Sequence, residues 1–435
     1  MPFRIIVVLI GAIGSAITAV VYPYVGLLMM VFLNFGRPQD DRPNLEPLHI
    51  PMMITIAVLV GTLARFGSTG RPLVAGVKRL WIVFALFALM CVSALNHWTE
   101  LSKYRLDEFS TLLAFCVLTL GLVTTEKRLR GYMIMVLASG AYNILRAVRN
   151  PSHIQESIGY EHFERMSIAK GNTVFGNSNY LALFMVIIIA VGLTLLGYYR
   201  AVWQRALLLA LVGGAGYVFF RANSRGASIA LAMVMLFLWL LQKRKLKAAV
   251  IGLVILAIVA LAAPSSYWDR LSTVTRYEQD ESATSRLELW DIALQLISEH
   301  PALGVGPDNF SLYAPNTPHN AYLQMASEVG LPALLVYIVC LATGLYSAWS
   351  AYRLSLRPGG NAYIRAASQG AFCCVLAVMI QGFTTGLAHR ELVYVSVTIC
   401  YCMQGFAARA RAETQKQEIK SHDALLEVAS PTAGV

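Results

Sequence analysis

The sequence has few charged residues and no cysteine pattern that would hold a metal. Charged residues make up 14% of its 435 positions and hydrophobic residues 57%, whereas soluble domains carry about 25% charged residues. This composition excludes an ordinary soluble domain. The cysteines form no C-x-x-C pair and lie mostly inside apolar runs, so we expect no metal site and no disulfide framework. They are Cys91, Cys116, Cys340, Cys373, Cys374, Cys400 and Cys402.

Nucleotide and metal-diphosphate motifs are also lacking. The chain has no P-loop and no dinucleotide-binding glycine fingerprint. The acidic residues of the long polar region after residue 264 are scattered and form no D-x-D pair of the kind that holds a metal diphosphate. They include Asp269, Asp280, Glu281 and Asp308. An enzyme that acts on a diphosphate here would therefore offset its charge with arginine, and we expect no cofactor.

What the sequence does have is a series of apolar runs, each about 17–25 residues long, which is the length of a membrane-spanning helix. Alternating strands are not seen, so we predict an all-α polytopic membrane protein with about 12 spans. After a first apolar block, the expected spans are 50–66, 80–95, 109–125, 132–148, 179–199, 206–220, 227–241, 248–263, 331–352, 366–385 and 392–406.

The first apolar block, 5–35, is too long for one span and barely long enough for two. Pro23 interrupts it, because proline cannot continue a helix interior without losing a hydrogen bond. The block is therefore either one span with a half-helix or two short spans.

The basic residues indicate the orientation of the bundle. The net charge of +11 could suggest nucleic acid, but lysine and arginine cluster in short loops between spans, which is the positive-inside pattern. We therefore expect no nucleic-acid partner. The loop residues on the cytoplasmic side are Arg65, Arg71, Lys78, Arg79, Lys127, Arg128, Arg130, Arg200, Arg205, Lys243, Lys247, Arg353, Arg357, Arg365, Arg409 and Arg411. If the first block crosses once, both termini are cytoplasmic, and the segments 149–177, 221–225, 264–327 and 389–391 all face outward.

This layout divides the chain into four parts. Residues 1–263 form a transmembrane bundle of about nine spans with a smaller outer loop at 149–177. Residues 264–327 form a large outer loop with amphipathic helices, 328–408 form the last three spans, and 409–435 form a cytoplasmic tail.

The long polar interruption from Ser285 to Glu328 carries the main chemical signal. Ser285 and Glu288 have the spacing of a capping box, which places Arg286 at the first helical position. Thr317 followed by proline predicts a second helix start, with His319 in its first turn. A helix N-terminus favours phosphate and disfavours imidazolium. We therefore interpret these starts as an anion site beside a proton-accepting histidine.

Simpler interpretations remain open for both residues. Arg286 can be the polar start of a surface amphipathic helix, whose apolar stripe of Leu287, Trp290, Leu294 and Ile297 is structural. His319 can be an ordinary polar residue at a helix start.

The turn R-A-N-S-R-G at 221–226 is basic although it faces outward. Arg221 can simply extend to lipid phosphates from the end of a span. Ser224 can cap the next helix, which puts Arg225 in its first turn, and Gly226 permits close approach of a ligand or backbone. Arginine suits a diphosphate because its fork binds two oxygens at once.

Five elements in this order resemble the bacterial O-antigen ligase and polymerase superfamily, of the WaaL and Wzy type. They are G-N-S-N-Y-L-A at 176–182, S-R-G at 224–226, T-S-R-L-E-L-W at 284–290, H-P-A-L-G-V-G at 300–306 and P-H-N-A-Y-L-Q at 318–324. The resemblance implies a GT-C-type glycosyltransferase of the bacterial inner membrane that takes a glycan from undecaprenyl diphosphate at the periplasmic face without a metal.

The resemblance also implies site residues. The essential arginines of the family correspond to Arg225 and Arg286, and its loop histidine corresponds to His319. We expect the arginines to bind the diphosphate and His319 to deprotonate the acceptor hydroxyl, so that direct displacement inverts the anomeric centre. Four further residues are expected to bind the diphosphate or glycan, namely Arg221, Arg165, Asn320 and His389.

The acceptor separates the members of the superfamily. The large loop with His319 near its end resembles the ligases, which join O-antigen to lipid A–core. An O-antigen polymerase and a protein O-glycosylation ligase are alternatives that use the same donor. A lipid-linked glycan flippase is the non-enzyme alternative, although the spans offer few charged residues for a path. The expected partners are the lipid-linked donor, lipid A–core and membrane lipids.

Overall fold

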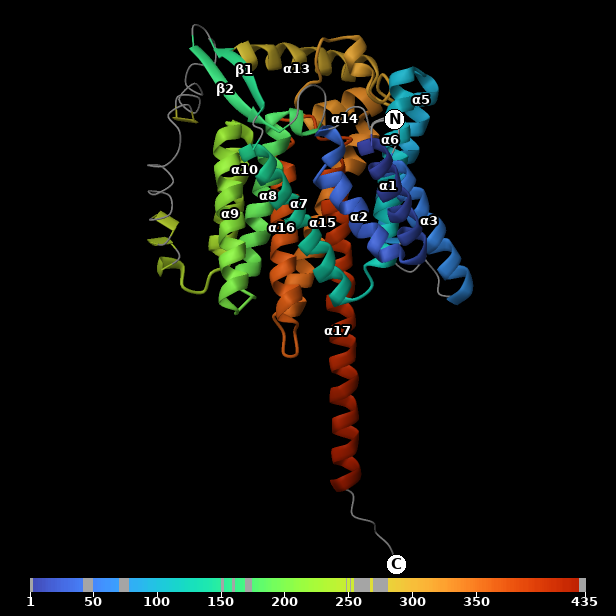
Figure 1. Ribbon diagram of the computed structural model, residues 1–435, viewed down its shortest axis with the longest axis vertical. Helices are drawn as coiled ribbons and strands as arrows, with labels where there is room; N and C mark the ends of the chain where they lie inside the picture. Colours follow the sequence, from blue (N-terminus) through green and yellow to red (C-terminus); the bar gives the residue numbers. More distant parts are fainter. Residues whose placement is uncertain are drawn as a thin grey trace, which may run out of the picture.

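The computed structural model describes residues 3–41, 50–69, 78–149, 152–158, 161–168, 174–247, 249–250, 252–253, 267–268 and 281–429. Most of these residues form a helical bundle (Figure 1). The bundle helices before the large loop are α1 (Phe3–Val21), α2 (Pro23–Phe35), α3 (Ile50–Thr69), α5 (Trp81–Asn96), α6 (Glu100–Leu122), α7 (Glu126–Arg149), α8 (Ser178–Leu196), α9 (Val202–Ala222) and α10 (Arg225–Leu240). The large loop contains α13 (Glu281–Glu299) and the start of α14 (Ala321–Val329), and it is followed by α15 (Leu331–Ser355), α16 (Ala362–Gln381) and α17 (Glu391–Ala429).

The length and composition of these helices are those of a polytopic membrane protein. Among the described residues, six helices are long and apolar enough to cross a membrane: 126–149, 178–196, 202–222, 331–355, 362–381 and 391–412. Five shorter apolar helices are 11–21, 23–35, 50–66, 81–96 and 225–240. Most of the expected span 248–263 lies outside the described residues, so the number twelve stays a prediction.

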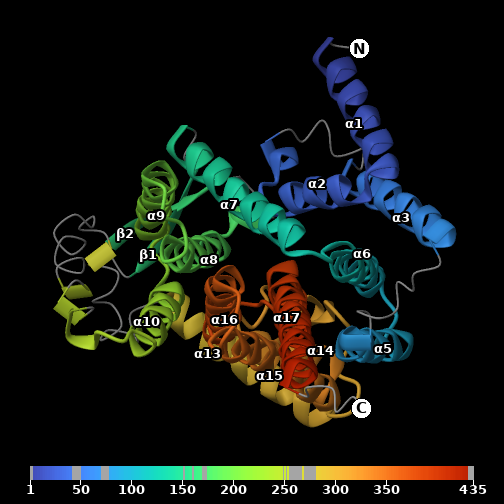
Figure 2. The ribbon, with the colours of Figure 1, turned by 90° about the horizontal axis from the view of Figure 1, so that it is seen from below.

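Helix α8 forms the centre of one half of the bundle. It is apolar all round and almost every side chain along it is buried, as expected for a helix with neighbours on all sides. It packs against α9 and α16, and Figure 2 shows it enclosed by α7, α9, α10 and α16. Its first residues, Ser178 to Tyr180, are therefore held firmly at the end of the bundle where the polar segments gather.

The first apolar block consists of two helices. The chain turns sharply at Tyr22, and the turn brings the backbone of Gly26 against Ala19, where a side chain at Gly26 would have no room. Gly61 of α3 packs just as closely on Val20. Figure 1 draws the start of α1 and the far end of α17 toward opposite ends of the bundle, whereas both termini were expected on one side if the block crosses once. The break at Pro23 is the cause, because it lets the block run down the bundle and turn back.

Nearly all of the described chain is helical, in agreement with the all-α prediction, and one polar segment adds two short strands. Strands β1 (Ser152–Ile158) and β2 (Glu161–Ser167) form an antiparallel hairpin in which Ser152 pairs with Ser167 and Ile158 with Glu161. This segment is polar and lies outside the apolar spans, so two short strands can satisfy each other's backbone without lipid excluding them.

The hairpin, α13 and α14 lie at the same end of the bundle, and α17 extends beyond the opposite end (Figure 1). We call the end with the hairpin, α13 and α14 the polar end. The helices α8, α10, α15 and α17 begin there, and α9 and α16 finish there.

Candidate functional site

The α9–α10 turn places Arg225 at the start of a helix, as the sequence predicted. Asn223 ends α9 in the left-handed region at φ 49°. Ser224 caps α10, since its Oγ accepts from the Ala227 N–H at 3.4 Å and donates to Asn179 Oδ1 at 2.8 Å. Arg225 is thus the first residue of α10, and it is half-buried. Arg221 lies one turn earlier in the last turn of α9.

Gly226 is needed for a close backbone contact. A Cβ at this position would lie 1.9 Å from Thr384 Oγ1, far closer than any real contact. Thr384 belongs to the segment Gly382–Arg390 between α16 and α17, which we call the outer turn. The start of α10, and with it Arg225, is therefore pressed directly against the outer turn.

Arg286 lies inside a helix rather than at its first position, so that prediction is wrong. Helix α13 begins at Glu281, one turn before the expected capping box at Ser285. A cap contributes only about 1 kcal/mol, and glutamate and alanine in the preceding turn favour helix. Arg286 is half-buried, on the second turn of α13.

Helix α13 packs on the large loop through a face slightly different from the expected stripe. Its buried residues are Leu289, Ala293 and Leu296, which contact Val305, Phe310 and Ala314 of the loop. The exposed residues of the expected stripe are Leu287 and Leu294.

The indole of Trp290 connects α13 to the segment of His319. Trp290 Nε1 donates to Pro318 O at 2.8 Å. Because residues four apart lie on the same helix face, Arg286 is one turn from that bond on the same side of α13. The structure thus brings Arg286 toward the segment that carries His319.

His319 precedes its helix instead of lying in the first turn, which corrects the second predicted start. Helix α14 begins at Ala321, and Asn320 caps it by accepting from the Tyr322 and Leu323 N–H groups at 3.0 and 3.2 Å. Asparagine is a stronger cap than threonine, so it defines the start. Asn320 is buried, and its Oδ1 serves the backbone. His319 is half-buried and has φ 50°, a conformation that few residues other than glycine adopt.

The outer turn joins the segments that carry the predicted residues. The Ala321 N–H, two residues after His319, donates to Gly382 O at 2.7 Å. Tyr180 OH at the start of α8 donates to Gly386 O at 2.6 Å. Together with the contact at Gly226, these bonds place one short segment between the starts of α8, α10 and α14.

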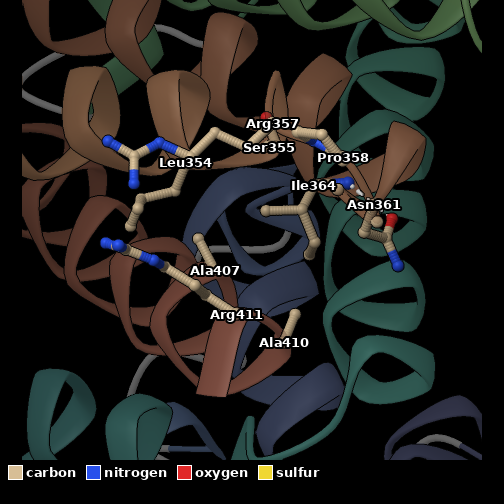
Figure 3. Close-up of a pocket in the computed structure, with 11 residues that line it drawn as sticks. Leu354, Ser355, Arg357, Pro358, Asn361, Ile364, Ala407, Ala410 and Arg411 are labelled. Carbon is tan, nitrogen blue, oxygen red and sulfur yellow. Dashed lines mark hydrogen bonds between the residues drawn. The ribbon is translucent and has the colours of Figure 1, made fainter. Parts of the chain in front are cut away.

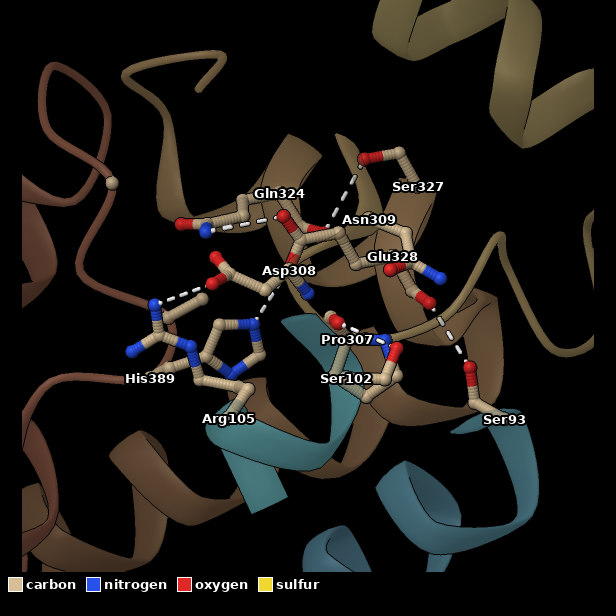
Figure 4. Close-up of polar contacts among 12 residues, drawn as sticks. Ser93, Ser102, Arg105, Pro307, Asp308, Asn309, Gln324, Ser327, Glu328 and His389 are labelled. Atoms are coloured by element: carbon tan, nitrogen blue, oxygen red, sulfur yellow. Dashed lines mark hydrogen bonds and ion pairs between the residues drawn. The ribbon is translucent and has the colours of Figure 1, made fainter. Parts of the chain in front are cut away.

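His389, predicted to bind substrate, is instead a buried residue of the outer turn. Its Nε2 lies 2.7 Å from Glu328 Oε2, and the two side chains are 2% and 0% exposed. Glu328 Oε2 also accepts from the Asp308 N–H at 3.1 Å, and its Oε1 accepts from Gln324 Nε2 at 3.3 Å (Figure 4). The sequence analysis did not single out Glu328 as a partner, although an acidic residue just before an apolar span is a signal that could have identified it.

The polar network continues into α5 and α6 (Figure 4). Arg105 pairs with Asp308 at 2.9 Å, and Ser93 Oγ donates to the Glu328 carbonyl at 3.0 Å. Gly304 and Gly306, in the H-P-A-L-G-V-G element, both have positive φ and form a turn, which we call the glycine turn. It lies against the end of α14, where the Gly306 N–H donates to Glu328 O at 2.8 Å.

Arg390 is a further cation at the outer turn that the sequence analysis missed. Its guanidinium carbon lies 5.2 Å from the ring centre of Tyr180. The interaction with Tyr180 and the nearby Glu391 and Glu108 raise the pKa of Arg390 above its usual value despite burial, so it stays charged.

Tyr322 is not suited to act as a base. Burial raises the pKa of Tyr322 to about 12, and its hydroxyl donates to Met379 O at 2.9 Å. A phenol with such a pKa stays protonated at physiological pH.

Arg165 lies in β2, where its backbone pairs with Ile154. Strand β2 packs on α8 and α9, and β1 packs on α13. The hairpin is therefore adjacent to the helices that carry Arg221 and Arg286. Within the described residues, no group of three or more histidine, cysteine or acidic side chains is arranged to hold a metal ion.

Two cavities lie at the end opposite the predicted residues. One, of about 160 Å³, is formed by the α15–α16 loop and α17, with Arg357 and Arg411 beside it (Figure 3). The other, of about 480 Å³, is lined by residues including Tyr24, Arg65 and Arg128. Neither cavity includes a predicted site residue.

The fold and the site together define a polytopic membrane protein whose polar residues converge between helix starts at one end of the bundle. Residues 207–338 match the family model described as O-Antigen ligase. The match confirms the resemblance predicted from the sequence and covers Arg225, Arg286 and His319, and it supports an enzyme of the O-antigen ligase or polymerase type. No curated protein matches the chain.

Proposed function

We propose that this protein is an O-antigen ligase, which transfers a glycan from undecaprenyl diphosphate to a sugar hydroxyl of lipid A–core at the periplasmic face of the inner membrane. The observation that carries the proposal is the outer turn, which contacts both the α10 start at Gly226 and the α14 start at Ala321. Arg225 is the first residue of α10 and His319 lies just before α14. The outer turn therefore contacts both helix starts that carry these residues.

The arginines supply charge for the leaving group. Arg225 and Arg286 bind the diphosphate oxygens, and Arg225 does so at the start of α10, where the helix dipole favours an anion. Arg221 and Arg165, on the adjacent α9 and β2, bind the outer part of the diphosphate or the glycan. Diphosphate is already a good leaving group, so stabilising its charge is the main electrostatic requirement.

His319 acts as the base. Its imidazole takes the proton of the acceptor hydroxyl while the hydroxyl oxygen forms a bond to the anomeric carbon. The bond from that carbon to the phosphate oxygen breaks, and undecaprenyl diphosphate leaves with the electron pair. One displacement inverts the configuration, so a product with retained configuration would contradict this mechanism.

The φ of 50° at His319 supports a functional role. Non-glycine residues in this region are uncommon and gather at functional sites, where surrounding structure holds them. Here the Trp290 bond to Pro318 and the Asn320 cap fix the backbone on both sides of His319.

Other acceptors define the alternatives. A polymerase would pass the glycan to another lipid-linked glycan, and a protein O-glycosylation ligase would pass it to a protein hydroxyl. The family match over 207–338 fits these enzymes as well. A lipid-linked glycan flippase would catalyse no transfer.

Transfer assays with purified protein in detergent separate these possibilities. The donor is an undecaprenyl-diphosphate glycan, the acceptor is lipid A–core, and EDTA is present in one arm. We expect transfer that survives EDTA and is lost in His319→Ala and Arg286→Ala. Growth of the glycan on its own carrier, with lipid A–core unchanged, would indicate a polymerase. If neither acceptor receives glycan, protein acceptors and lipid-linked glycan transport are tested next.

A further inference from the structure

We propose that the hydrogen bond between His389 and Glu328 is a latch that fixes the outer turn and thereby sets the relative position of Arg225 and His319. His389 and Glu328 are then positioning residues rather than ligands of the substrate. The inference rests on the proposed function for its kinetic consequence, but its structural consequence can be measured without any activity.

The His389–Glu328 pair is buried inside the protein. The side chains of His389 and Glu328 are 2% and 0% exposed, so a substrate cannot reach the bond without rearrangement of the turn. Removing one member of such a pair leaves a buried polar group without its partner, which is costly. The outer turn is therefore tied to α14 at this point more strongly than by a surface contact.

Glu328 is held by hydrogen bonds from several other segments of the protein. Its two carboxylate oxygens accept from His389 Nε2, from the Asp308 N–H and from Gln324 Nε2. Its backbone carbonyl accepts from Ser93 Oγ and the Gly306 N–H. Glu328 thus has a fixed place at the end of α14, against α5 and the glycine turn, and it can anchor the outer turn through His389.

The outer turn contacts the starts of α8, α10 and α14. Within nine residues it provides Gly382 O for the Ala321 N–H, Thr384 against Gly226, and Gly386 O for Tyr180 OH. A shift of the turn would move the α10 and α14 starts relative to each other. A misplacement of about 1 Å in a reacting geometry can reduce a rate about 100-fold, so a latch at His389 would affect transfer although it lies outside the reacting groups.

The test uses two amides that differ by one methylene. In His389→Gln the side-chain amide nitrogen can occupy the place of histidine Nε2 and donate to Glu328. In His389→Asn the side chain is one methylene shorter, so its amide nitrogen cannot reach Glu328. We expect His389→Gln to keep kcat within about threefold, and His389→Asn to lose kcat about tenfold or more with the KM for the donor changed much less.

Glu328→Gln and Glu328→Leu form the second pair. In Glu328→Gln the new side chain keeps an oxygen that can accept from His389. Its amide nitrogen needs an acceptor, and Gln324 can supply one by rotating its side-chain amide. Among the described residues, Gln324 Oε1 is buried without a partner. The leucine keeps none of these bonds. We expect kcat close to that of the unmodified protein in Glu328→Gln and a large loss in Glu328→Leu.

Hydrogen exchange provides a readout that does not depend on catalysis. The Ala321 amide is protected by Gly382 O, so His389→Asn should speed its exchange and His389→Gln should not. Equal kcat and equal exchange in the two His389 variants would overturn the latch. If the unmodified protein transfers no glycan, the proposed function fails, and the exchange rates at Ala321 still decide whether the latch exists. If Glu328→Leu does not fold, the His389 pair decides the matter.

Discussion

Trp290 Nε1 donates to the carbonyl oxygen of Pro318 at 2.8 Å, across 28 residues of the large loop. The bond joins the third turn of α13 to the residue directly before His319. It fixes the distance between the helix that carries Arg286 and the backbone that carries His319, although neither side chain takes part in it. The relative position of a diphosphate-binding arginine and a base would depend on this one indole.

Trp290→Phe tests this dependence. Phenylalanine keeps most of the ring but cannot donate, so we expect a loss of about 1 kcal/mol in stability, the usual value of one hydrogen bond. Glycan transfer should fall by about tenfold, chiefly in kcat, because alignment suffers more than binding. The control is Trp203→Phe, an exposed tryptophan at the opposite end of the bundle, which should change neither quantity. Normal transfer by folded Trp290→Phe would show that the bond is not needed for alignment.

His319→Gly and His319→Ala separate the roles of the imidazole and the backbone. At φ 50° a non-glycine residue costs roughly 1–2 kcal/mol relative to glycine, so His319→Gly should be at least as stable as the unmodified protein. Both variants lack a base, and we expect both to lose transfer by about 100-fold or more. Thermal unfolding and transfer are measured on the same preparations. A His319→Gly variant that is both stable and active would exclude His319 as the base.

Arg225→Lys and Arg286→Lys test whether the site requires the arginine fork. Lysine keeps the charge but not two parallel N–H donors, so we expect the KM for the donor to rise by about tenfold in each variant. Arg357→Lys, an exposed residue at the opposite end of the bundle, is the matched control and should be unaffected. Inhibition by free undecaprenyl diphosphate should weaken in parallel with the KM of the donor. An unchanged KM in both variants would contradict diphosphate binding by these arginines.

The sequence predicted the features that depend on nearby residues. Runs of apolar residues located most of the described helices to within a few positions, although α6 begins nine residues before its expected span and α17 ends 23 residues after its own. Ser224 was correctly identified as the cap before Arg225. Two helix starts were misplaced because several polar residues competed for the cap. Asn320 prevailed over Thr317, and α13 extended through Ser285 to Glu281. Caps differ by only about 1 kcal/mol, so the surrounding structure decides between them.

The parts that were not predicted depend on contacts between distant segments. The pairing of Glu328 with His389 spans 61 residues, and the contact of Gly226 with Thr384 joins the start of α10 to the outer turn, which is remote in sequence. No periodicity or motif records such a pairing. His389 was expected to bind substrate because it lies in a polar turn, but only the packed structure reveals that it is buried against a carboxylate.

Gly226→Ala tests whether the outer turn positions Arg225. The added methyl would lie 1.9 Å from Thr384 Oγ1, so the Thr384 side chain, the turn or the start of α10 must move. We expect transfer to fall by about tenfold or more. Gly213→Ala on α9, where a Cβ meets nothing within 4 Å, is the control and should leave transfer unchanged. Combining Gly226→Ala with Thr384→Ala removes the closest atom and leaves only the Thr384 Cβ position at 3.0 Å, so part of the activity should return. A double variant that is no more active than Gly226→Ala alone, with both proteins folded, would show that the glycine serves a purpose other than contact with the outer turn.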